Sequence, residues 1–335
     1  MIKLGIIYGG TSTEHNVSEM SAKSVIENID KEKYEIHEIY INEYGKWFEI
    51  IKGEKEKIYN IVWLLKELDV VFPVLHGKGG EDGTIQGMFE MLQVPYVGCG
   101  ILSSSIGMDK VYSKAIFEHV GIPQAPYIYV KKKQNSYIIV NQDYEEEEMQ
   151  LSKIISKIKF PMFIKPSNSG SSVGVKKATN SEELKKAIEY AGRYDDKILI
   201  EQGIEGKEVE CAILEEEEIN ASTVGEIQSA EEFYSFDAKY NIPESKTIIP
   251  ANIKKEKIEE IRKLAIKAFK AIDGKGLARV DFFIENDTDK IYINEINTMP
   301  GFTEISMYPK LFENVGITYK ELLNKLIENA INTRN

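Results

Sequence analysis

Short apolar runs alternate with amphipathic segments over the first third of the chain. The pattern predicts strands and helices in turn, at residues 2–8, 16–29, 34–41, 60–68, 69–76, 84–92, 94–97 and 103–120. Such alternation is typical of a parallel sheet with helices on its faces, so we expect residues 1–122 to form one α/β domain. The carboxyl ends of these strands line a ligand crevice, which favours Glu14 and His76 as pocket residues. Taken singly, an acid at a helix start and a turn histidine are more often structural.

The pattern changes to hairpins and helices beyond a linker rich in Gly and Pro at residues 121–126. Residues 123–211 are expected to form a central α+β domain. Residues 212–335 are expected to form a third domain, with a long amphipathic helix at about 254–272. The long polar segment 229–248 within it is a candidate lid over a site.

Two apolar runs flank a polar turn centred near Thr288 and predict a β-hairpin. Alternate side chains share a face of a strand, so Asp281 is expected opposite Glu295 and Arg279 opposite Asn297. Facing carboxylates repel each other. A divalent cation removes the repulsion, because Mg²⁺ binds carboxylate oxygens together with phosphate oxygens. A hairpin with one solvated face is the alternative interpretation.

A loop of glycines and small hydroxyl residues at 166–174 follows an apolar strand that ends in Lys165. Such a loop lets backbone N–H groups approach an anion, and it lacks the Gly-Lys-Ser/Thr of a Walker A loop. A loop without a ligand is the alternative, but a bare ammonium at the end of an apolar strand would be costly. Glu201 and Glu208 could contact a base and a ribose, although an ordinary surface turn is the simpler interpretation of that stretch.

Composition narrows the class of protein. The chain has 335 residues and a formal net charge of −12, which argues against general affinity for nucleic acid or anionic membranes. Its two cysteines are far apart, which indicates neither a disulfide framework nor a zinc site. The first apolar run is too short for a signal peptide, and no run approaches the roughly 20 apolar residues of a membrane span. We therefore expect a cytoplasmic protein with no nucleic-acid or membrane partner.

Motifs in order along nearly the whole chain resemble those of D-alanine–D-alanine ligases of the ATP-grasp superfamily. They are Gly9–Glu14, Leu75–Gly87, Met108–Lys110, Lys165–Gly174, Ala238–Tyr240, Ala278–Asp281 and Asn294–Thr303. The resemblance implies an α/β, three-domain ATP-grasp fold with an N-terminal parallel-sheet domain. It also implies a homodimer, and ATP held between the second and third domains.

The resemblance further implies roles for individual residues. The residues expected to bind ATP are Lys110, Lys165, Ser172, Glu201, Ile204, Glu208, Lys239 and Phe283. Those expected to hold two Mg²⁺ ions, which Mn²⁺ could replace, are Asp281, Glu295 and Asn297. Those expected to be catalytic are Glu14, His76, Ser171, Tyr240, Arg279 and Gly301. The first D-alanine would contact Glu14 and His76, and the second would contact Ser306 and Met307.

The implied activity is the ATP-dependent ligation of two D-alanine molecules through an acyl phosphate, for peptidoglycan precursor synthesis. D-lactate and D-serine are alternative second substrates. We expect D-alanine, because the hydroxyl of Tyr240 could complete a network with Glu14 and Ser171, and Met307 offers no charge to a hydroxylated partner. A non-catalytic ATP-binding regulator is a further alternative, but it would need no oxyanion stabiliser such as Arg279.

Overall fold

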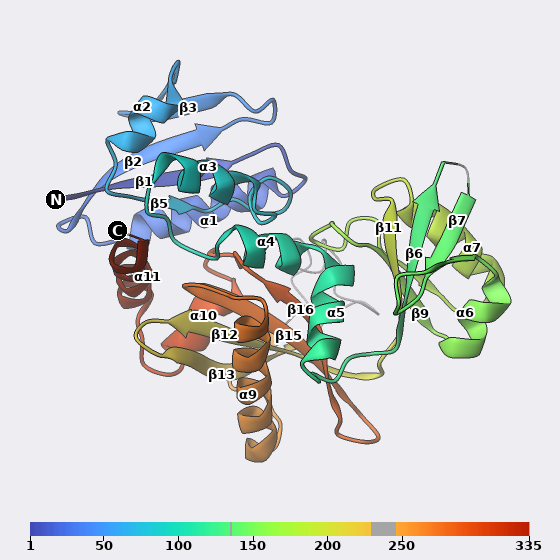
Figure 1. The fold of residues 1–335 in the computed structure, drawn as a ribbon. Coiled ribbons are helices and arrows are strands. Elements are labelled where there is room, and N and C mark those ends of the chain that lie inside the picture. The colour runs from blue at the N-terminus through green and yellow to red at the C-terminus, as the bar shows by residue number, and fades with distance from the viewer. Residues whose placement is uncertain (135, 229–245, 335) are drawn as a thin grey trace.

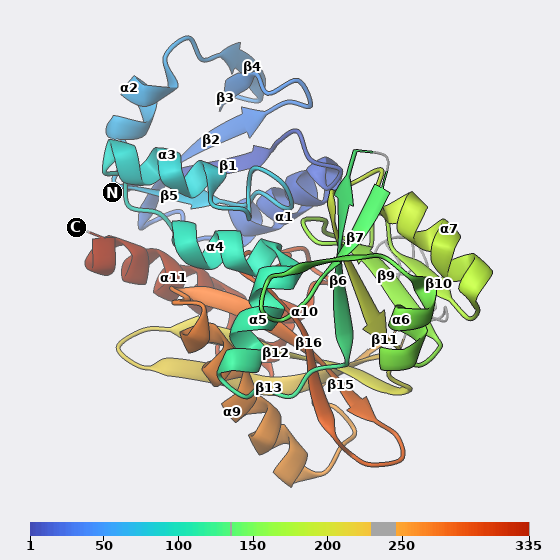
Figure 2. The same ribbon diagram turned by 45° about the vertical axis from the view of Figure 1, so that its right-hand side comes forward.

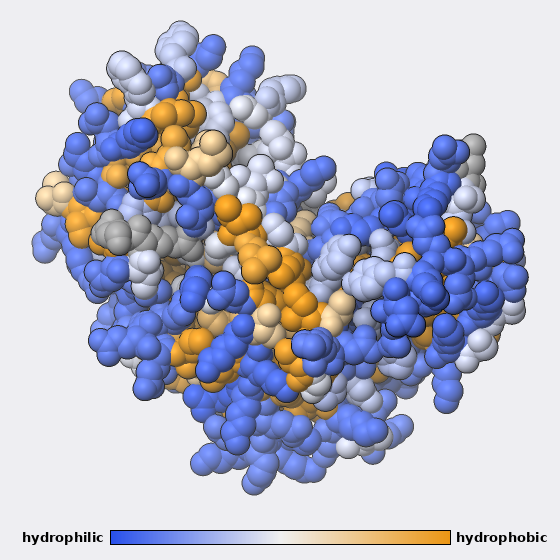
Figure 3. Space-filling view, in the orientation of Figure 1, coloured by the Kyte–Doolittle hydropathy of each residue, from blue (hydrophilic) through white to orange (hydrophobic). Residues whose placement is uncertain are grey.

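The computed structural model describes residues 1–134, 136–228 and 246–334, which form three β-sheets with helices packed on them. Figure 1 shows the first sheet at the upper left, the central sheet at the right and the third sheet below and between them. Viewed from the same side, the surface is hollowed between the parts built on the first and central sheets (Figure 3). The exposed side chains of Ile101 and Leu102 contribute to an apolar band over α4 (Ile101–Met108).

The first sheet has the strand order β4-β3-β2-β1-β5. Parallel pairing joins β1 (Ile2–Gly9), β2 (Tyr34–Ile41) and β5 (Val70–Pro73), and the antiparallel hairpin of β3 (Trp47–Ile51) and β4 (Glu54–Lys57) extends the edge. Its faces carry α1 (His15–Asn28), α2 (Ile61–Lys66) and α3 (Thr84–Leu92). The strand β1 is apolar on both faces because it is buried on both, as expected for a parallel sheet.

Two predicted elements of this region differ in the structure. The strand expected at 94–97 is reduced to a single bridge between Val71 and Tyr96. The helix expected at 103–120 is divided into α4 and α5 (Lys110–His119). Asp109 divides them, because its backbone is extended (φ −89°, ψ 99°) and its carboxylate accepts the N–H groups of Val111 and Tyr112 as an N-cap.

The central sheet is antiparallel, with the order β10-β9-β11-β6-β7-β8. Its strands are β6 (Tyr127–Lys133), β7 (Ser136–Val140), β8 (Glu146–Glu148), β9 (Met162–Pro166), β10 (Lys176–Ala178) and β11 (Lys197–Gln202). Apolar side chains of β6, β9 and β11 pack against α6 (Leu151–Lys157) and α7 (Ser181–Ala191). Both helices lie on the outer side of the sheet, so its other face is left for a site (Figure 2).

The third sheet is also antiparallel, with the order β14-β13-β12-β15-β16. Its strands are β12 (Gly206–Glu215), β13 (Ile219–Gln228), β14 (Lys246–Ile248), β15 (Leu277–Glu285) and β16 (Ile291–Asn297). One face packs against α9 (Lys255–Ala271) and α5. On the other face, Ala212 and Leu214 pack against α10 (Met307–Glu313) and α11 (Tyr319–Arg334). Charged residues, Glu210 and Arg279 among them, lie on the same face beside this apolar cluster.

The predicted hairpin is confirmed as β15 and β16. Asp281 pairs with Glu295 and Arg279 with Asn297, in the predicted register. The register then shifts after Asp281, because Phe282 pairs with Ile293 and leaves Asn294 as an extra residue on β16. Such bulges redirect a side chain. Here Asn294 accepts a hydrogen bond from Lys165 of the central sheet.

One expected domain boundary can be placed on this architecture. The boundary between residues 211 and 212 falls inside β12, which belongs to the third sheet along its whole length. We propose a division in the turn at residues 203–205 instead. Helix α11 packs on the first sheet as well as on the third, so the C-terminal helix completes the core beneath β1 and β5.

The candidate lid lies largely outside the described residues. Of the segment 229–248, the structure describes only residues 246–248, which form β14. Lys239 and Tyr240 both lie outside the described residues. In the parts of the chain that are described, none of the helices combines the length and apolar character needed to cross a membrane.

Candidate active site

Two connected cavities lie where the three sheets approach one another. The larger, of about 500 Å³, is lined by the central and third sheets. The smaller, of about 110 Å³, is lined by the loops of the first domain and the third sheet. Lys110, Ser169, Ser171, Ile227 and Glu295 line both. A ligand that filled the larger cavity would therefore reach into the smaller one at these residues.

The larger cavity contains every described residue that the sequence assigns to ATP. These are Lys110, Lys165, Ser172, Glu201, Ile204, Glu208 and Phe283. Phe163 and Ile293 also line it, so one part of its wall is apolar and another carries charge. Clefts that combine an apolar wall with directed polar groups are typical of small-molecule sites.

A carboxylate held between two lysines forms part of the larger cavity. Glu201 Oε2 lies 2.7 Å from Lys165 Nζ, and Glu201 Oε1 lies 2.6 Å from Lys114 Nζ. Burial alone would raise the pKa of Glu201, but the two ammonium groups outweigh it and lower that pKa to about 2. Burial likewise opposes the charged form of Lys165, yet Glu201 raises its pKa above the ordinary value. Both groups are therefore charged at neutral pH.

The small-residue loop closes over Glu14. Ser171 and Ser172 have φ of +45° and +60°, and this turn brings Ser171 Oγ to donate a hydrogen bond to the Glu14 carboxylate. A Cβ atom on Gly170 would lie 2.5 Å from Glu14 Oε2, so glycine is required for this approach. Lys110 Nζ donates to the backbone carbonyl of Ser169 at 2.8 Å and fixes the other side of the loop.

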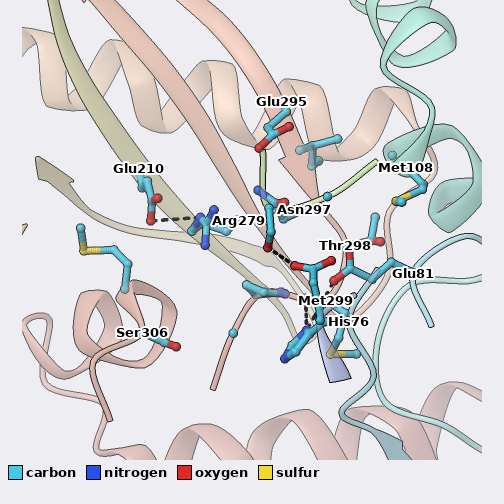
Figure 4. Close-up of a pocket in the computed structure, with 18 of the residues that line it drawn as sticks. His76, Glu81, Met108, Glu210, Arg279, Glu295, Asn297, Thr298, Met299 and Ser306 are labelled. Carbon is cyan, nitrogen blue, oxygen red and sulfur yellow. Dashed lines mark hydrogen bonds and ion pairs between the residues drawn. The ribbon is translucent and has the colours of Figure 1, made fainter. Parts of the chain in front are cut away.

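Three carboxylates lie in one row across the third sheet. Glu210 on β12 pairs with Asp281 on β15, which pairs with Glu295 on β16. Arg279 lies among them, with Nε 2.8 Å from Asp281 Oδ1 and Nη2 2.7 Å from Asp281 Oδ2. Its Nε also lies 3.0 Å from Glu210 Oε2 (Figure 4). Lys110 Nζ lies 3.2 Å from Glu295 Oε2. Burial would lower the pKa of Arg279, but Asp281 and Glu210 raise it well above its ordinary value.

The same row has the donor atoms of a divalent-cation site. Asp281 and Glu295 supply carboxylates, and Asn297, whose Nδ2 donates to Asp281 Oδ2 at 3.0 Å, supplies an amide. Among the described residues, no group of three or more His, Cys, Asp or Glu side chains is arranged to hold a metal ion. The hard oxygen donors present nevertheless fit Mg²⁺, which keeps positions for phosphate oxygens and water.

A buried histidine and a partly buried acid close the smaller cavity at the first domain. His76 Nδ1 lies 3.2 Å from the Met299 carbonyl oxygen and 3.4 Å from Glu81 Oε1, and its Nε2 lies 3.0 Å from Ser21 Oγ. His76, Glu81 and Met299 lie close together below Asn297 in Figure 4. Burial opposes the charged imidazolium, but Glu81 raises the pKa of His76 above its ordinary value. Burial also raises the pKa of Glu81.

The loop after β16 forms the remaining wall of the smaller cavity. Gly301, Ser306 and Met307 all line it. A Cβ atom on Gly301 would lie 2.7 Å from Ser306 Oγ, which itself accepts a hydrogen bond from the Thr303 N–H at 2.9 Å. The backbone at Gly301 therefore lies close to Ser306, and a side chain at this position would displace the Ser306 hydroxyl.

The structure thus brings together every described residue that the sequence assigns to the site. Asp281 differs from the others because it lies behind Arg279 and Asn297 and lines neither cavity. Sequence reasoning missed Glu81, Lys114 and Glu210. The strand period points to Glu210, two residues after Glu208, and the helical period points to Lys114, four residues after Lys110.

Comparisons with known proteins agree with this geometry. The family described as D-ala D-ala ligase N-terminus matches residues 3–62 and 52–99, and D-ala D-ala ligase C-terminus matches residues 116–328. A D-alanine–D-alanine ligase from Acetivibrio thermocellus is 49% identical, with 98% of this chain and 96% of the relative covered. One from Ruminiclostridium cellulolyticum is 47% identical, with 98% and 95% covered.

Solved structures give the same picture. The D-alanine–D-alanine ligase from Coxiella burnetii has a TM-score of 0.83 and 31% identity, and the match covers 99% of this chain and 94% of that one. The VanG D-Ala:D-Ser ligase from Enterococcus faecalis has a TM-score of 0.83 and 35% identity, with 98% and 99% covered. The α/β fold class expected from the sequence is therefore confirmed.

Proposed function

The chain belongs to the D-alanine–D-alanine ligase family, and from this we propose that it joins two D-alanine molecules at the expense of ATP. The product would be D-alanyl-D-alanine, and the cell would use it as a peptidoglycan precursor. The observation that carries the proposal is the meeting of the two cavities at Lys110, Ser171 and Glu295. A nucleotide in the larger cavity would present its terminal phosphate to a substrate in the smaller one.

ATP would occupy the larger cavity with its base near Ile204 and Phe283 and its ribose near Glu208. Lys110 and Lys165, together with Lys239 from outside the described residues, would contact the phosphates. Backbone N–H groups of the loop around Ser172 would approach the same oxygens, as in other anion-binding turns. The arrangement suits phosphoryl transfer, which needs positioning and neutralised charge more than covalent assistance.

Enzymes of this family use ATP with a divalent metal, and we propose two Mg²⁺ ions held by Asp281, Glu295 and Asn297. Mn²⁺ has similar donor preferences and could replace Mg²⁺. When bound, the ions would neutralise charge on the phosphate oxygens. Arg279 and Lys110 offset the row of carboxylates in the structure described here, and a cation at the row would take over part of that balance.

We propose that the first D-alanine places its ammonium group on Glu14 and its carboxylate near His76. An oxygen of that carboxylate attacks the γ-phosphorus, and ADP leaves, which gives an acyl phosphate. The amine of the second D-alanine, held near Ser306 and Met307 and deprotonated, then attacks the carbonyl carbon. The C–O bond to the phosphate breaks, and inorganic phosphate leaves with the bridging oxygen.

Arg279 and the Gly301 N–H would stabilise the oxyanion that forms during this attack. Donors aimed at a developing charge in a buried site are among the largest contributions to catalysis. Asp281 and Glu210 fix the guanidinium through Nε and Nη2. Among the described residues no partner of the Nη1 N–H groups is found, so these groups could donate to a ligand in the cavity that Arg279 lines. Ser171, Glu14 and Tyr240 would together close the site against water, which would otherwise hydrolyse the acyl phosphate.

The test is product identification after incubation with ATP, Mg²⁺ and D-alanine. We expect D-alanyl-D-alanine, ADP and phosphate in equal amounts. Phosphate release that does not depend on D-alanine would instead favour a non-catalytic or regulatory ATP-binding protein. Matched reactions without Mg²⁺ and with L-alanine serve as controls.

The likeness to the VanG D-Ala:D-Ser ligase gives a second candidate activity, with D-serine as the second substrate. Competition between D-alanine, D-serine and D-lactate at neutral pH separates the candidates. We expect the dipeptide of D-alanine to predominate, because Met307 at the cavity wall offers no partner for a hydroxyl group. Predominance of the D-serine product or of the depsipeptide would overturn this specificity.

We also propose that the protein works in the cytoplasm as a homodimer. ATP is a cytoplasmic substrate, and the apolar band over α4 that includes Ile101 and Leu102 is a surface that a second copy could cover. Light scattering coupled to size-exclusion chromatography tests the assembly. We expect the mass of two chains, and the mass of one chain at micromolar concentration would contradict the proposal.

A further inference from the structure

Lys114 is a buried lysine behind the wall of the larger cavity. It is 1% exposed and is absent from the residues that line either cavity. Its ammonium group forms an ion pair with Glu201 and lies 5.5 Å from the centre of the Tyr127 ring. Burial lowers the pKa of Lys114 below its ordinary value, and the contact with Glu201 opposes that shift and favours the charged ammonium. A lysine is almost never so deeply buried unless it is paired, so the pairing with Glu201 needs an explanation.

Strand pairing places Glu201 between Lys114 and Lys165. Lys165 on β9 pairs with Leu199 on β11, so Glu201, two residues further along the same face, is its diagonal neighbour. Lys114 reaches the other carboxylate oxygen from α5. The carboxylate is 5% exposed, and each of its oxygens contacts one ammonium group.

We propose that Lys114 is a positioning residue that balances the charge of Glu201, so that the charge of Lys165 stays available to the phosphates of the nucleotide. The inference rests on the proposed ATP site. With both lysines charged, the cluster of Lys114, Lys165 and Glu201 has one net positive charge. Of the two lysines, only Lys165 lines the cavity. Without Lys114, Lys165 and Glu201 form a closed neutral pair, and attraction to the phosphates weakens.

A purely structural role is the competing interpretation, in which Lys114 only ties α5 to the central sheet. The lowered pKa of Glu201, about 2, agrees with two cations acting on one carboxylate, but it would also accompany a structural pair. The two interpretations differ in what happens when the charge of Glu201 is removed as well. Balancing predicts that the ratio of ATP affinity to adenosine affinity recovers, even if both affinities fall because Glu201 contacts the base. A structural tie predicts no recovery of that ratio.

The experiment measures the affinities of ATP and adenosine, each with Mg²⁺ and without D-alanine, by calorimetry or competition. Their ratio reports the phosphate contribution. Loss of one charge-assisted contact typically weakens binding about tenfold. We therefore expect the ratio to fall about tenfold in Lys114→Met and to return to within about threefold of the wild type in Lys114→Met/Glu201→Gln.

Lys186→Met is the matched control. It removes a lysine that also pairs with a glutamate, Glu182 at 2.7 Å, on the exposed surface of α7, so the ratio is expected to stay unchanged. If Lys114→Met does not fold, Lys114→Gln replaces it, because glutamine still donates to Glu201 but carries no charge. The tenfold fall is then expected in Lys114→Gln.

An unchanged ratio in the folded single variant would overturn the inference. Equal losses for ATP and adenosine, or a double variant no better than the single one, would overturn it too. These results are distinct from failure of the proposed function. The wild type could bind ATP, and the variants could show the expected fall and recovery of the ratio, while no D-alanyl-D-alanine forms. That result would refute the ligase activity and leave the role of Lys114 standing.

Discussion

Replacing Arg279 with methionine leaves two buried carboxylates without their shared cation, and we expect it to destabilise the fold as well as stop the reaction. The guanidinium contacts Asp281 through two nitrogens, at 2.8 and 2.7 Å, and Glu210 at 3.0 Å. Glu210 is 3% exposed and Asp281 is 2% exposed, so water does not replace the lost contacts. Methionine keeps much of the side-chain length but offers no donor.

The expected size of the effect follows from this burial. Removing one partner of a buried ion pair costs about 3–5 kcal/mol. Proteins are commonly stable by about 5–15 kcal/mol, so the loss is a large part of the free energy of unfolding. Removal of one oxyanion donor also lowers kcat by about 10²–10³-fold. Arg279→Met should therefore show both a lower free energy of unfolding and a lower kcat.

Urea unfolding followed by circular dichroism measures the first effect, and dipeptide formation measures the second. Arg262→Met is the matched control, because it also removes an ion pair, with Glu259 at 2.9 Å, and a hydrogen bond to the Ala221 carbonyl, but at a side chain that is 38% exposed. An exposed pair is worth about 0–1 kcal/mol. Adding Glu210→Gln to Arg279→Met removes one of the two buried carboxylate charges that have lost the arginine. The double variant should therefore regain part of the stability.

The reasoning on Arg279 would be refuted by a variant about as stable as Arg262→Met. It would also be refuted if the added Glu210→Gln lowered stability further. Full dipeptide formation by a folded Arg279→Met protein would remove the oxyanion role independently of the stability result.

Three further predictions concern the metal, the loop after β16 and pH. Glu295→Gln should keep the fold but raise the Mg²⁺ concentration needed for half-maximal turnover by at least about tenfold, and unchanged kcat at modest Mg²⁺ would exclude the metal role. Gly301→Ala should lower kcat without unfolding the protein, because its Cβ would lie 2.7 Å from Ser306 Oγ; activity assays beside a thermal melt check this, and wild-type kcat would contradict it. The pKa of Glu201 is lowered from 4.5 to about 2, so its ionisation stabilises the fold fully above the higher value and progressively less below it. The difference in unfolding free energy between wild type and Glu201→Gln should accordingly be constant near neutral pH and change as the pH falls below 4.5; a change confined to alkaline pH would contradict it.

Much of the fold could be predicted because its strands and helices have clear periods. The parallel strands β1, β2 and β5 are continuous apolar runs, and the register of β15 with β16 follows from the position of its turn. Local backbone chemistry was harder to predict. Asp109 divides one apolar helical pattern into two helices because it is the N-cap of α5. The spacing of hydrophobic residues does not indicate this break.

The packing of α11 against the first sheet could not be predicted either. It is a contact between the two ends of the chain, and an amphipathic pattern does not say which partner covers it. The expected division between residues 211 and 212 falls inside β12 for a related reason. Gly206–Glu208 resemble a turn in the sequence because they are polar. They are polar although they begin β12, since this end of the strand lines the larger cavity and not a core.

Site residues could be predicted from the sequence where several functional side chains lie on one face of a strand. Arg279, Asp281, Glu295 and Asn297 share one face by period alone. Lys114 shows the limit of that reasoning. A lysine on an amphipathic helix is normally solvated, and only the tertiary contact with Glu201 reveals that this one is buried.

The most direct test of the central claim follows one oxygen atom. D-alanine labelled with ¹⁸O in both carboxylate positions is incubated with the protein, ATP and Mg²⁺, and the released phosphate is analysed by mass spectrometry. An acyl phosphate route transfers one labelled oxygen to phosphate, because the bridging oxygen leaves with phosphorus when the second amine attacks carbon. We predict one ¹⁸O in each phosphate released with a dipeptide. Unlabelled phosphate accompanying dipeptide formation would contradict the account.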